Sequence, residues 1–146
     1  MGLFTSFDIS GSGMSAQRLR SDIIMQNIAN VSSTNTANGG PYRRKTVVFA
    51  EKSGLSFGDV LMSVTGMNGT GVKITSIVED YETPMNMVYD PAHPDADENG
   101  YVTYPNVNVV TEMTNLIDAS RSYEANVTAF NASKAMAAKG LEIGQN

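Results

Sequence analysis

Apolar or small residues recur at helical spacing along the last third of the chain. Between residues 109 and 141 they follow steps of three and four, interrupted by Lys134. This is the heptad spacing of a coiled-coil seam, and it predicts a C-terminal helical region over 106–146 with Asn106 or Asn108 as its N-cap. The positions of the seam are Val109, Met113, Leu116, Ser120, Tyr123, Val127, Phe130, Ala137 and Leu141.

A second stripe of mostly small residues follows the same predicted helix on another face. Small side chains let a second backbone come close, and a helix that is apolar on two faces is an interior element. We therefore expect this helix to be buried on both faces. The stripe consists of Ala125, Ala129, Ala132 and Met136.

A shorter helix is predicted within residues 1–31. Its apolar positions favour a helix from about residue 12 to residue 31, with Gly11-Ser12-Gly13 as its entrance and Ser10 or Ser12 as its cap. At 1.5 Å per residue it would be about 30 Å long, against about 48 Å for a helix over 108–139. The unmatched length leaves exposed apolar surface, which predicts assembly with other subunits, and a contact that does not close on itself builds a filament. The apolar positions are Ala16, Leu19, Ile23, Ile24, Ile28 and Val31.

The middle of the chain, residues 32–105, is predicted to be a connector followed by a small β-rich region. Residues 32–41 are small and polar and are expected to form a flexible connector. Strands are predicted over 45–50, 72–81 and 101–104, and the glycines at 54 and 66–71 are expected to mark turns. The predicted fold class is therefore mainly α, with N- and C-terminal helices packed as a coiled-coil-like domain and a small β-rich insertion between them.

Composition narrows the possible functions. A net charge of -5 and a single basic cluster at 43–45 disfavour nucleic acid as a partner. The absence of cysteine removes disulfides and thiolate chemistry. No apolar run reaches the roughly 18 residues of a membrane span, and the N-terminus lacks the pattern of a cleaved signal peptide. We expect no membrane insertion.

The strongest candidate for chemistry is the acidic segment 95–100. It matches the first six positions of a calcium loop, but the twelfth position is Asn106 instead of a bidentate Glu. A tight turn is the favoured interpretation, and a small calcium-binding module using Asp95, Asp97 and Asn99 stays open as the lesser alternative. His93 lacks an identifiable catalytic partner. We therefore predict no enzyme, no cofactor and no metal site.

Several longer motifs carry a resemblance to a known family. They are Ser12-Gly13-Met14-Ser15-Ala16-Gln17-Arg18-Leu19-Arg20, Asn27-Ile28-Ala29-Asn30-Val31, Gly40-Pro41-Tyr42-Arg43-Arg44-Lys45, the stretch from Val88 to Asp97, Gly100-Tyr101-Val102, Pro105-Asn106-Val107-Asn108, and Ala119-Ser120-Arg121-Ser122-Tyr123-Glu124-Ala125-Asn126. In this order they resemble bacterial flagellar basal-body rod proteins of the FlgC type, which belong to the flagellar axial proteins and form the proximal rod. Another axial subunit of the rod or hook is the nearest alternative.

The resemblance implies a structural role. A protein of this type would polymerise with copies of itself and with other rod subunits, enclose the export channel and transmit torque. It would be located in the periplasmic rod of the basal body, exported by the flagellar type III apparatus without a cleaved signal. We expect the assembly interface at Ile23, Ile28, Val109, Met113, Leu116, Tyr123, Ala125, Val127, Ala129, Phe130, Ala132 and Leu141.

Overall fold

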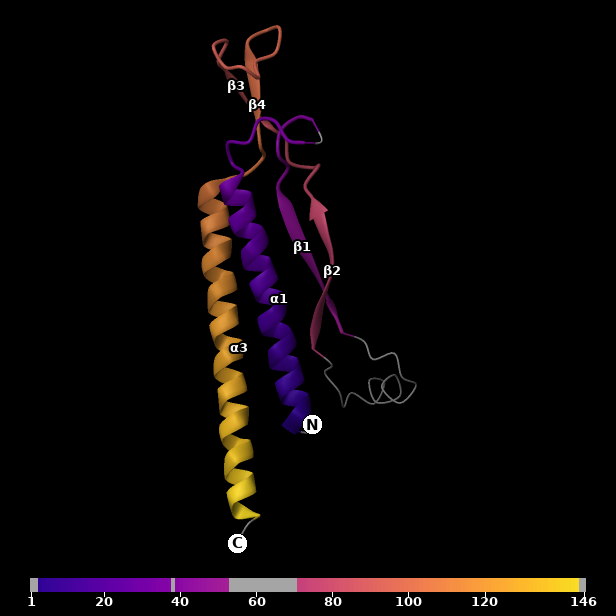
Figure 1. Cartoon of the computed structure of the whole chain (residues 1–146), viewed down its shortest axis with the longest axis vertical. Helices are drawn as coiled ribbons and strands as arrows, with labels where there is room; N and C mark the ends of the chain where they lie inside the picture. The colour runs from indigo at the N-terminus through magenta and orange to yellow at the C-terminus, as the bar shows by residue number, and fades with distance from the viewer. Residues whose placement is uncertain (1–2, 38, 53–70, 145–146) are drawn as a thin grey trace. The chain divides into compact units, whose positions relative to one another are not determined.

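Two long helices with short antiparallel strands between them make up the chain, in agreement with the predicted order of elements (Figure 1). The computed structural model describes residues 3–37, 39–52 and 71–144. The turns predicted at Gly54 and Gly66–Gly69 lie outside these residues. The elements are α1 (Leu3–Ala29), β1 (Lys45–Glu51), β2 (Val72–Glu79), β3 (Asn86–Tyr89), β4 (Tyr101–Tyr104) and α3 (Val109–Ile143).

Helix α1 begins nine residues earlier than the sequence pattern predicts. The predicted entrance at Gly11-Ser12-Gly13 lies inside the helix, so the assignment of Ser10 or Ser12 as the N-cap is wrong. The Ser12 hydroxyl donates to the Ile9 carbonyl at 2.8 Å, a bond to the preceding turn of the same helix. Both glycines lower the helix propensity of this segment. Gly13 is explained by its close contact with the Asn126 side chain of α3.

Helix α3 begins where one of the two predicted caps places it. The Asn108 side chain accepts hydrogen bonds from the amides of Val110 (3.0 Å) and Thr111 (3.2 Å), so Asn108 is the N-cap. With 35 residues α3 is about 52 Å long, and α1 with 27 residues is about 40 Å long. The predicted inequality of the helices is confirmed, although both are longer than predicted.

The strands form two separate two-stranded sheets, β1–β2 and β3–β4. Asp80 N donates to Arg44 O and Lys52 N donates to Gly71 O, which shows the antiparallel register of the first pair at its two ends. In the second, Tyr89 pairs with Tyr101. Strand β4 has the predicted bounds, whereas β2 ends two residues early and β3 was not predicted.

The segment predicted as a flexible connector contains hydrogen-bonded turns. Thr36 N donates to Gly40 O at 2.9 Å, and Tyr42 N donates to Ser33 O at 3.0 Å, which closes the loop on itself. The Thr34 hydroxyl also donates to Asp95 at 2.7 Å. Backbone and hydroxyl pairing thus connects the described residues on either side of this segment without apolar burial.

The chain divides into two compact units, each containing part of both helices. The first comprises residues 1–19, 48–76 and 119–146, and the second comprises residues 20–47 and 77–118. Among the residues that the structure describes, the buried hydrophobic ones are Ala16 and Ala119 in the first unit and Ile23, Ile24, Tyr42, Val47 and Val102 in the second. Among the described residues, no helix combines the length and hydropathy that a membrane span requires.

Candidate assembly surface

The two helices meet in the first unit through small side chains and one aromatic pair. The rings of Phe7 in α1 and Phe130 in α3 lie 4.9 Å apart at an angle of 58°. At Gly13, an added Cβ would lie 2.7 Å from the Asn126 side chain, so the absence of a side chain allows this part of α3 to approach α1. Ala119 and Ser133 are buried on the same helix. Contact between the helices therefore rests on small residues as much as on large ones.

The start of β2 is attached to α1 within the same unit. The Ser12 hydroxyl accepts a hydrogen bond of 3.1 Å from the amide of Val72. The preceding residue, Gly71, has φ of +95°, and a side chain there would overlap the Ser12 hydroxyl. Glycine is therefore required at this position both by its backbone conformation and by the close approach.

A buried polar network joins the helices in the second unit. Asn27 is fully buried, and its Nδ2 donates to Lys45 O at 2.8 Å and to the Glu112 carboxylate at 2.9 Å. Its Oδ1 accepts from the Tyr42 hydroxyl at 3.0 Å and from Lys45 N at 2.9 Å. Both donor hydrogens and both lone pairs of this amide are thus used, and one side chain fixes α1, α3 and the first residue of β1.

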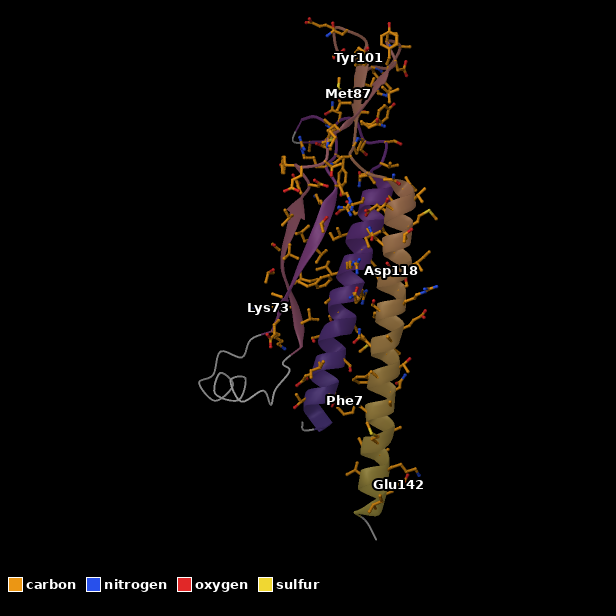
Figure 2. The ribbon with its side chains drawn as sticks, turned by 180° about the vertical axis from the view of Figure 1, so that it is seen from behind. Phe7, Lys73, Met87, Tyr101, Asp118 and Glu142 are labelled. Carbon is orange, nitrogen blue, oxygen red and sulfur yellow. The ribbon has the colours of Figure 1, made fainter. Side chains whose placement is uncertain are left out.

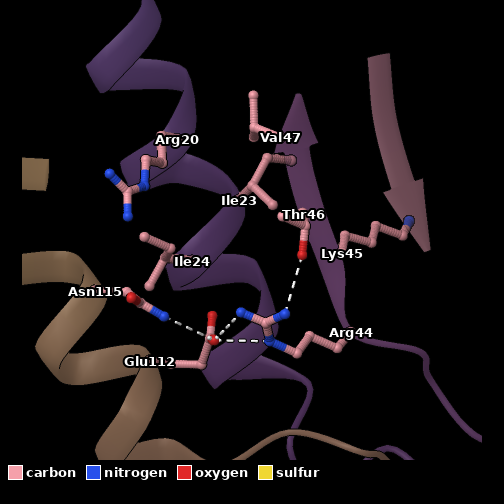
Figure 3. A pocket seen from close by; sticks show the side chains of 9 residues that line it. All are labelled: Arg20, Ile23, Ile24, Arg44, Lys45, Thr46, Val47, Glu112 and Asn115. Atoms are coloured by element: carbon pink, nitrogen blue, oxygen red, sulfur yellow. Dashed lines mark hydrogen bonds and ion pairs between the residues drawn. The ribbon is translucent and has the colours of Figure 1, made fainter. Parts of the chain in front are cut away.

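The charge of Glu112 is balanced in the same network. Glu112 is fully buried, and Arg44 donates to its Oε1 from both Nε and Nη2 at 2.9 Å. Asn115 donates to the same oxygen at 3.4 Å (Figure 3). A buried carboxylate is tolerated only when it is paired and hydrogen bonded. Figure 3 shows two of these partners meeting it, Arg44 from the loop before β1 and Asn115 from α3 itself.

Asn106 connects this network to the segment after β2. Its Oδ1 accepts from Arg44 N at 2.9 Å, and its Nδ2 donates to the carbonyls of Asp80 (3.0 Å) and Thr83 (3.2 Å). Asn106 is therefore a buried linking residue and not the cap of α3. We call Asn27, Tyr42, Arg44, Asn106 and Glu112 together the polar clamp.

The pKa values of Tyr42 and Asp80 are shifted by their surroundings in the second unit. Burial, followed by the nearby carboxylates of Glu79 and Glu112, raises the pKa of Tyr42. Hydrogen bonds from the amide and hydroxyl of Thr83 are the main causes that lower the pKa of Asp80. The neutral phenol and the ionised carboxylate are thus the forms that the folded chain favours.

The polar clamp was not predicted as a site, although the sequence contains a signal for it. Asn27 follows Ile23 and Ile24 by four and three residues, which places an amide on the apolar face of α1. In the sequence, Glu112 is explained as a favourable charge in the first turns of its helix, near the positive end of the helix dipole. A buried asparagine and a buried glutamate both need partners, but the sequence alone does not name them.

The predicted seam of α3 does not coincide with the face that is buried in the structure. At several points the buried residue is the one just before the seam residue in sequence. The buried or half-buried positions include polar and small residues that the seam omits, because the seam was built from apolar spacing. Leu116, Val127, Phe130 and Ala137 belong to both sets. The positions that the seam omits are Glu112, Asn115, Ala119, Ser122, Asn126 and Ser133.

The remaining residues of the predicted interface are covered in α1 and exposed in α3. Ile23 is buried and Ile28 is half-buried within the second unit. Met113 is 54% exposed and Leu141 is 71% exposed, so the expectation that α3 is buried on two faces is not met within this single chain. The other exposed members of the predicted set are Val109, Tyr123, Ala125, Ala129 and Ala132.

The acidic segment 95–100 forms part of a turn between β3 and β4. Asp97 accepts hydrogen bonds from the amides of Asn99 (2.9 Å) and Tyr101 (2.8 Å), as expected for a turn carboxylate. His93 accepts from Asp95 N at 3.1 Å. Across residues 3–37, 39–52 and 71–144, no group of three histidine, cysteine or acidic side chains is placed to hold a metal ion.

Comparison with known proteins gives matches over the whole length. Residues 98–143 match the family described as flagellar basal body rod FlgEFG protein C-terminal. The flagellar basal-body rod protein FlgC of Borreliella burgdorferi is 46% identical, with 99% of both chains covered. Those of Bacillus subtilis and Salmonella typhimurium are 47% and 42% identical, with 99% of this chain and 100% of theirs covered.

Terminal helices joined by short strands, together with these matches, define a structural protein of the flagellar basal-body rod. This class is structural and not enzymatic. At these identities over 99% of its length, the chain belongs to the family of flagellar basal-body rod protein FlgC. The matches do not favour the alternatives of another axial subunit or a calcium-binding module.

Proposed function

We propose that the chain is a subunit of the proximal rod that polymerises with copies of itself and with other rod proteins through the exposed faces of its helices. In this proposal residues 1–31 and 106–146 form the axial helical domain with coiled-coil-like packing, and 32–105 form the connector and β-rich middle. The assembled helices enclose the export channel and transmit torque. Family membership supports this role, and the exposure of α3 supports the mode of assembly.

The observation that carries the proposal is the exposed stripe at Ala125, Ala129, Ala132 and Met136 in the first unit. Steps of three and four place these side chains on one face of α3. They are small except for the last, and Met136 is 64% exposed. Such a face suits close approach by a helix of a neighbouring subunit, as small residues at helix interfaces allow.

A second exposed stripe lies on α3 in the other unit. Val110, Met113 and Ile117 follow steps of three and four and are 74%, 54% and 53% exposed. Complete burial of a Val, Met or Ile side chain contributes about 1.5 to 3 kcal/mol. Covering this stripe in an assembly would therefore stabilise it appreciably, whereas a lone subunit gains nothing from it.

Location and export complete the proposal. A rod subunit of this family would lie in the periplasmic part of the basal body and reach it through the flagellar type III export apparatus, without a cleaved signal peptide. The family relationship supports this placement. The export apparatus, other rod proteins and further copies of the chain are therefore the proposed partners, and nucleic acid and membrane insertion are not part of the proposal.

The test replaces Ala129 by Glu in a flagellated bacterium whose own copy of the gene has been exchanged for this one. We expect the variant to be made and exported but absent from purified basal bodies, and the cells to be non-motile. The matched control is Ala138→Glu, an exposed alanine on the opposite side of α3. If Ala129→Glu assembles as well as Ala138→Glu, the stripe is not an assembly surface.

A further inference from the structure

The hairpin formed by β3 and β4 has an exposed apolar face and an acidic turn. Tyr89 and Tyr101 are cross-strand partners with rings 5.3 Å apart, and Met87 lies two residues before Tyr89 on the same face. These side chains are 64%, 42% and 60% exposed, respectively. Figure 2 labels Met87 and Tyr101 on this hairpin. A face of this kind is unusual on a free surface and typical of an interface.

Charge on this segment has a single sign. Residues 84–105 contain four carboxylates and no lysine or arginine. They are Asp90, Asp95, Asp97 and Glu98, and the last three are exposed. A partner for the hairpin therefore needs an apolar floor and positive charge beside it.

The first unit has a groove with these properties, lined by α1, by β2 and by Lys52, the residue that follows β1. It measures about 350 Å³ and lies within the range of ordinary binding sites. Most of its lining is apolar or small, and the charged residues that line it are Lys52 and Lys73. Both lysines are exposed. The lining residues are Ser12, Ser15, Ala16, Leu19, Lys52, Val72, Lys73 and Ile74.

We infer that the tyrosine face of the β3–β4 hairpin of one copy docks in the lysine-lined groove of a neighbouring copy. The inference rests on the proposed assembly and adds a contact made outside the exposed helix faces. Tyrosine rings and Met87 cover the apolar floor, while the turn carboxylates face Lys52 and Lys73. Two different surfaces meet in this contact, so each copy has a free hairpin and a free groove for further neighbours, as a helical array requires.

The absence of cysteine makes a direct test possible. Two single variants, Lys73→Cys and Glu98→Cys, are produced together in cells that lack the native gene, and intact basal bodies are treated with a short bismaleimide. We expect a product of twice the subunit mass from the pair and none from either variant alone. The matched control pairs Lys73→Cys with Glu142→Cys, an exposed position near the end of α3 (Figure 2), and should give none.

The outcomes separate this inference from the proposed function. If both variants are present in the rods and no doubled product forms, the hairpin does not dock in the groove, although the chain is still a rod subunit. If the unmodified chain is absent from the basal bodies, the proposed function itself fails. A doubled product from the Glu142→Cys pair alone would also overturn the inference.

Exchange of charges gives a second readout. Lys73→Glu places a carboxylate opposite the acidic turn and should lower the yield of assembled rods about fivefold, the factor for one exposed charge contact. Adding Glu98→Lys to the same chain should restore the yield, because every copy then carries the reversed pair. Failure of this rescue would contradict the proposed contact.

Discussion

The side-chain amide of Asn27 in α1 donates a hydrogen bond of 2.9 Å to the carboxylate of Glu112 in α3, across 85 residues of sequence. Both side chains are fully buried. Because Glu112 also binds Arg44, this contact joins both helices to the residue that precedes β1. The second unit is therefore held at one point by directional bonds, which specify a single relative position of the joined segments more strictly than apolar contact does.

Asn27→Ala should lower the free energy of unfolding by about 1 to 3 kcal/mol, because the substitution leaves buried partners unsatisfied. Chemical denaturation of the purified chain, followed by circular dichroism, measures the change. Asn131→Ala is the matched control on the exposed side of α3, and it should change stability little. Equal effects of the two substitutions would show that the polar clamp does not stabilise the fold.

Substitutions at Gly11 and Gly13 should differ, although the two glycines lie in the same helix. Nothing lies within 4 Å of an added Cβ at Gly11, so Gly11→Ala should stabilise the chain by about 0.5 to 1 kcal/mol through helix propensity. Gly13→Ala should stabilise the chain less than Gly11→Ala does, or should destabilise it, because the added Cβ would meet the Asn126 side chain. In an Asn126→Ala background the difference should disappear. Thermal melts of the five variants test this, and identical melts for both glycine substitutions would contradict it.

Phe7 and Phe130 should be energetically coupled, because their rings are in contact across the two helices. A double-mutant cycle with leucine at each position should give a coupling energy of about 0.5 to 1.5 kcal/mol, the value for an aromatic pair beyond its burial. Unfolding midpoints of the four proteins supply the cycle. A coupling energy of zero would mean that the ring contact does not contribute.

Asp80 should make the chain less stable in acid. Its pKa is lowered in the folded state, mainly by the amide and hydroxyl of Thr83, so the unfolded chain binds the proton more readily. The stabilisation is therefore present above the ordinary carboxyl pKa and is lost as the pH falls through the lowered value. Unfolding midpoints measured against pH should fall less steeply in Asp80→Asn. Thr83→Val removes the hydroxyl and keeps the amide, so it should give an intermediate slope. If both variants had the slope of the unsubstituted chain, the hydrogen bonds from Thr83 to Asp80 would not be the cause of the acid sensitivity.

The two helices could be predicted because their apolar residues follow steps of three and four over several turns. Their ends were harder to predict. Gly11 and Gly13 look like an entrance in the sequence, yet the contact between Gly13 and Asn126 places them inside α1. Tertiary packing overrides local propensity here. Strand β3 was not predicted, because it begins two residues after Pro84 and its first residue is Asn86, and both residue types are depleted in strands.

The buried face of α3 could not be identified from apolar spacing alone. Such spacing selects large residues, whereas the face that packs within the chain contains Ala119, Ser133 and Asn126. Large residues such as Met113 are left exposed. In an ordinary domain the two sets coincide. In this chain they overlap only in part, so apolar spacing does not identify which side chains of α3 are covered.

The small number of buried apolar side chains has a consequence for the response to temperature. Among the described residues the buried apolar side chains are Ala16, Ile23, Ile24, Tyr42, Val47, Val102 and Ala119. The heat capacity of unfolding grows with the apolar area that unfolding exposes, and it amounts to about 12 to 15 cal/mol/K per residue in ordinary domains. The heat capacity of unfolding of a free subunit should fall below that value, and its free energy of unfolding should therefore change only gently with temperature. The larger heat-capacity change would then accompany assembly, when the exposed residues of α3 leave water.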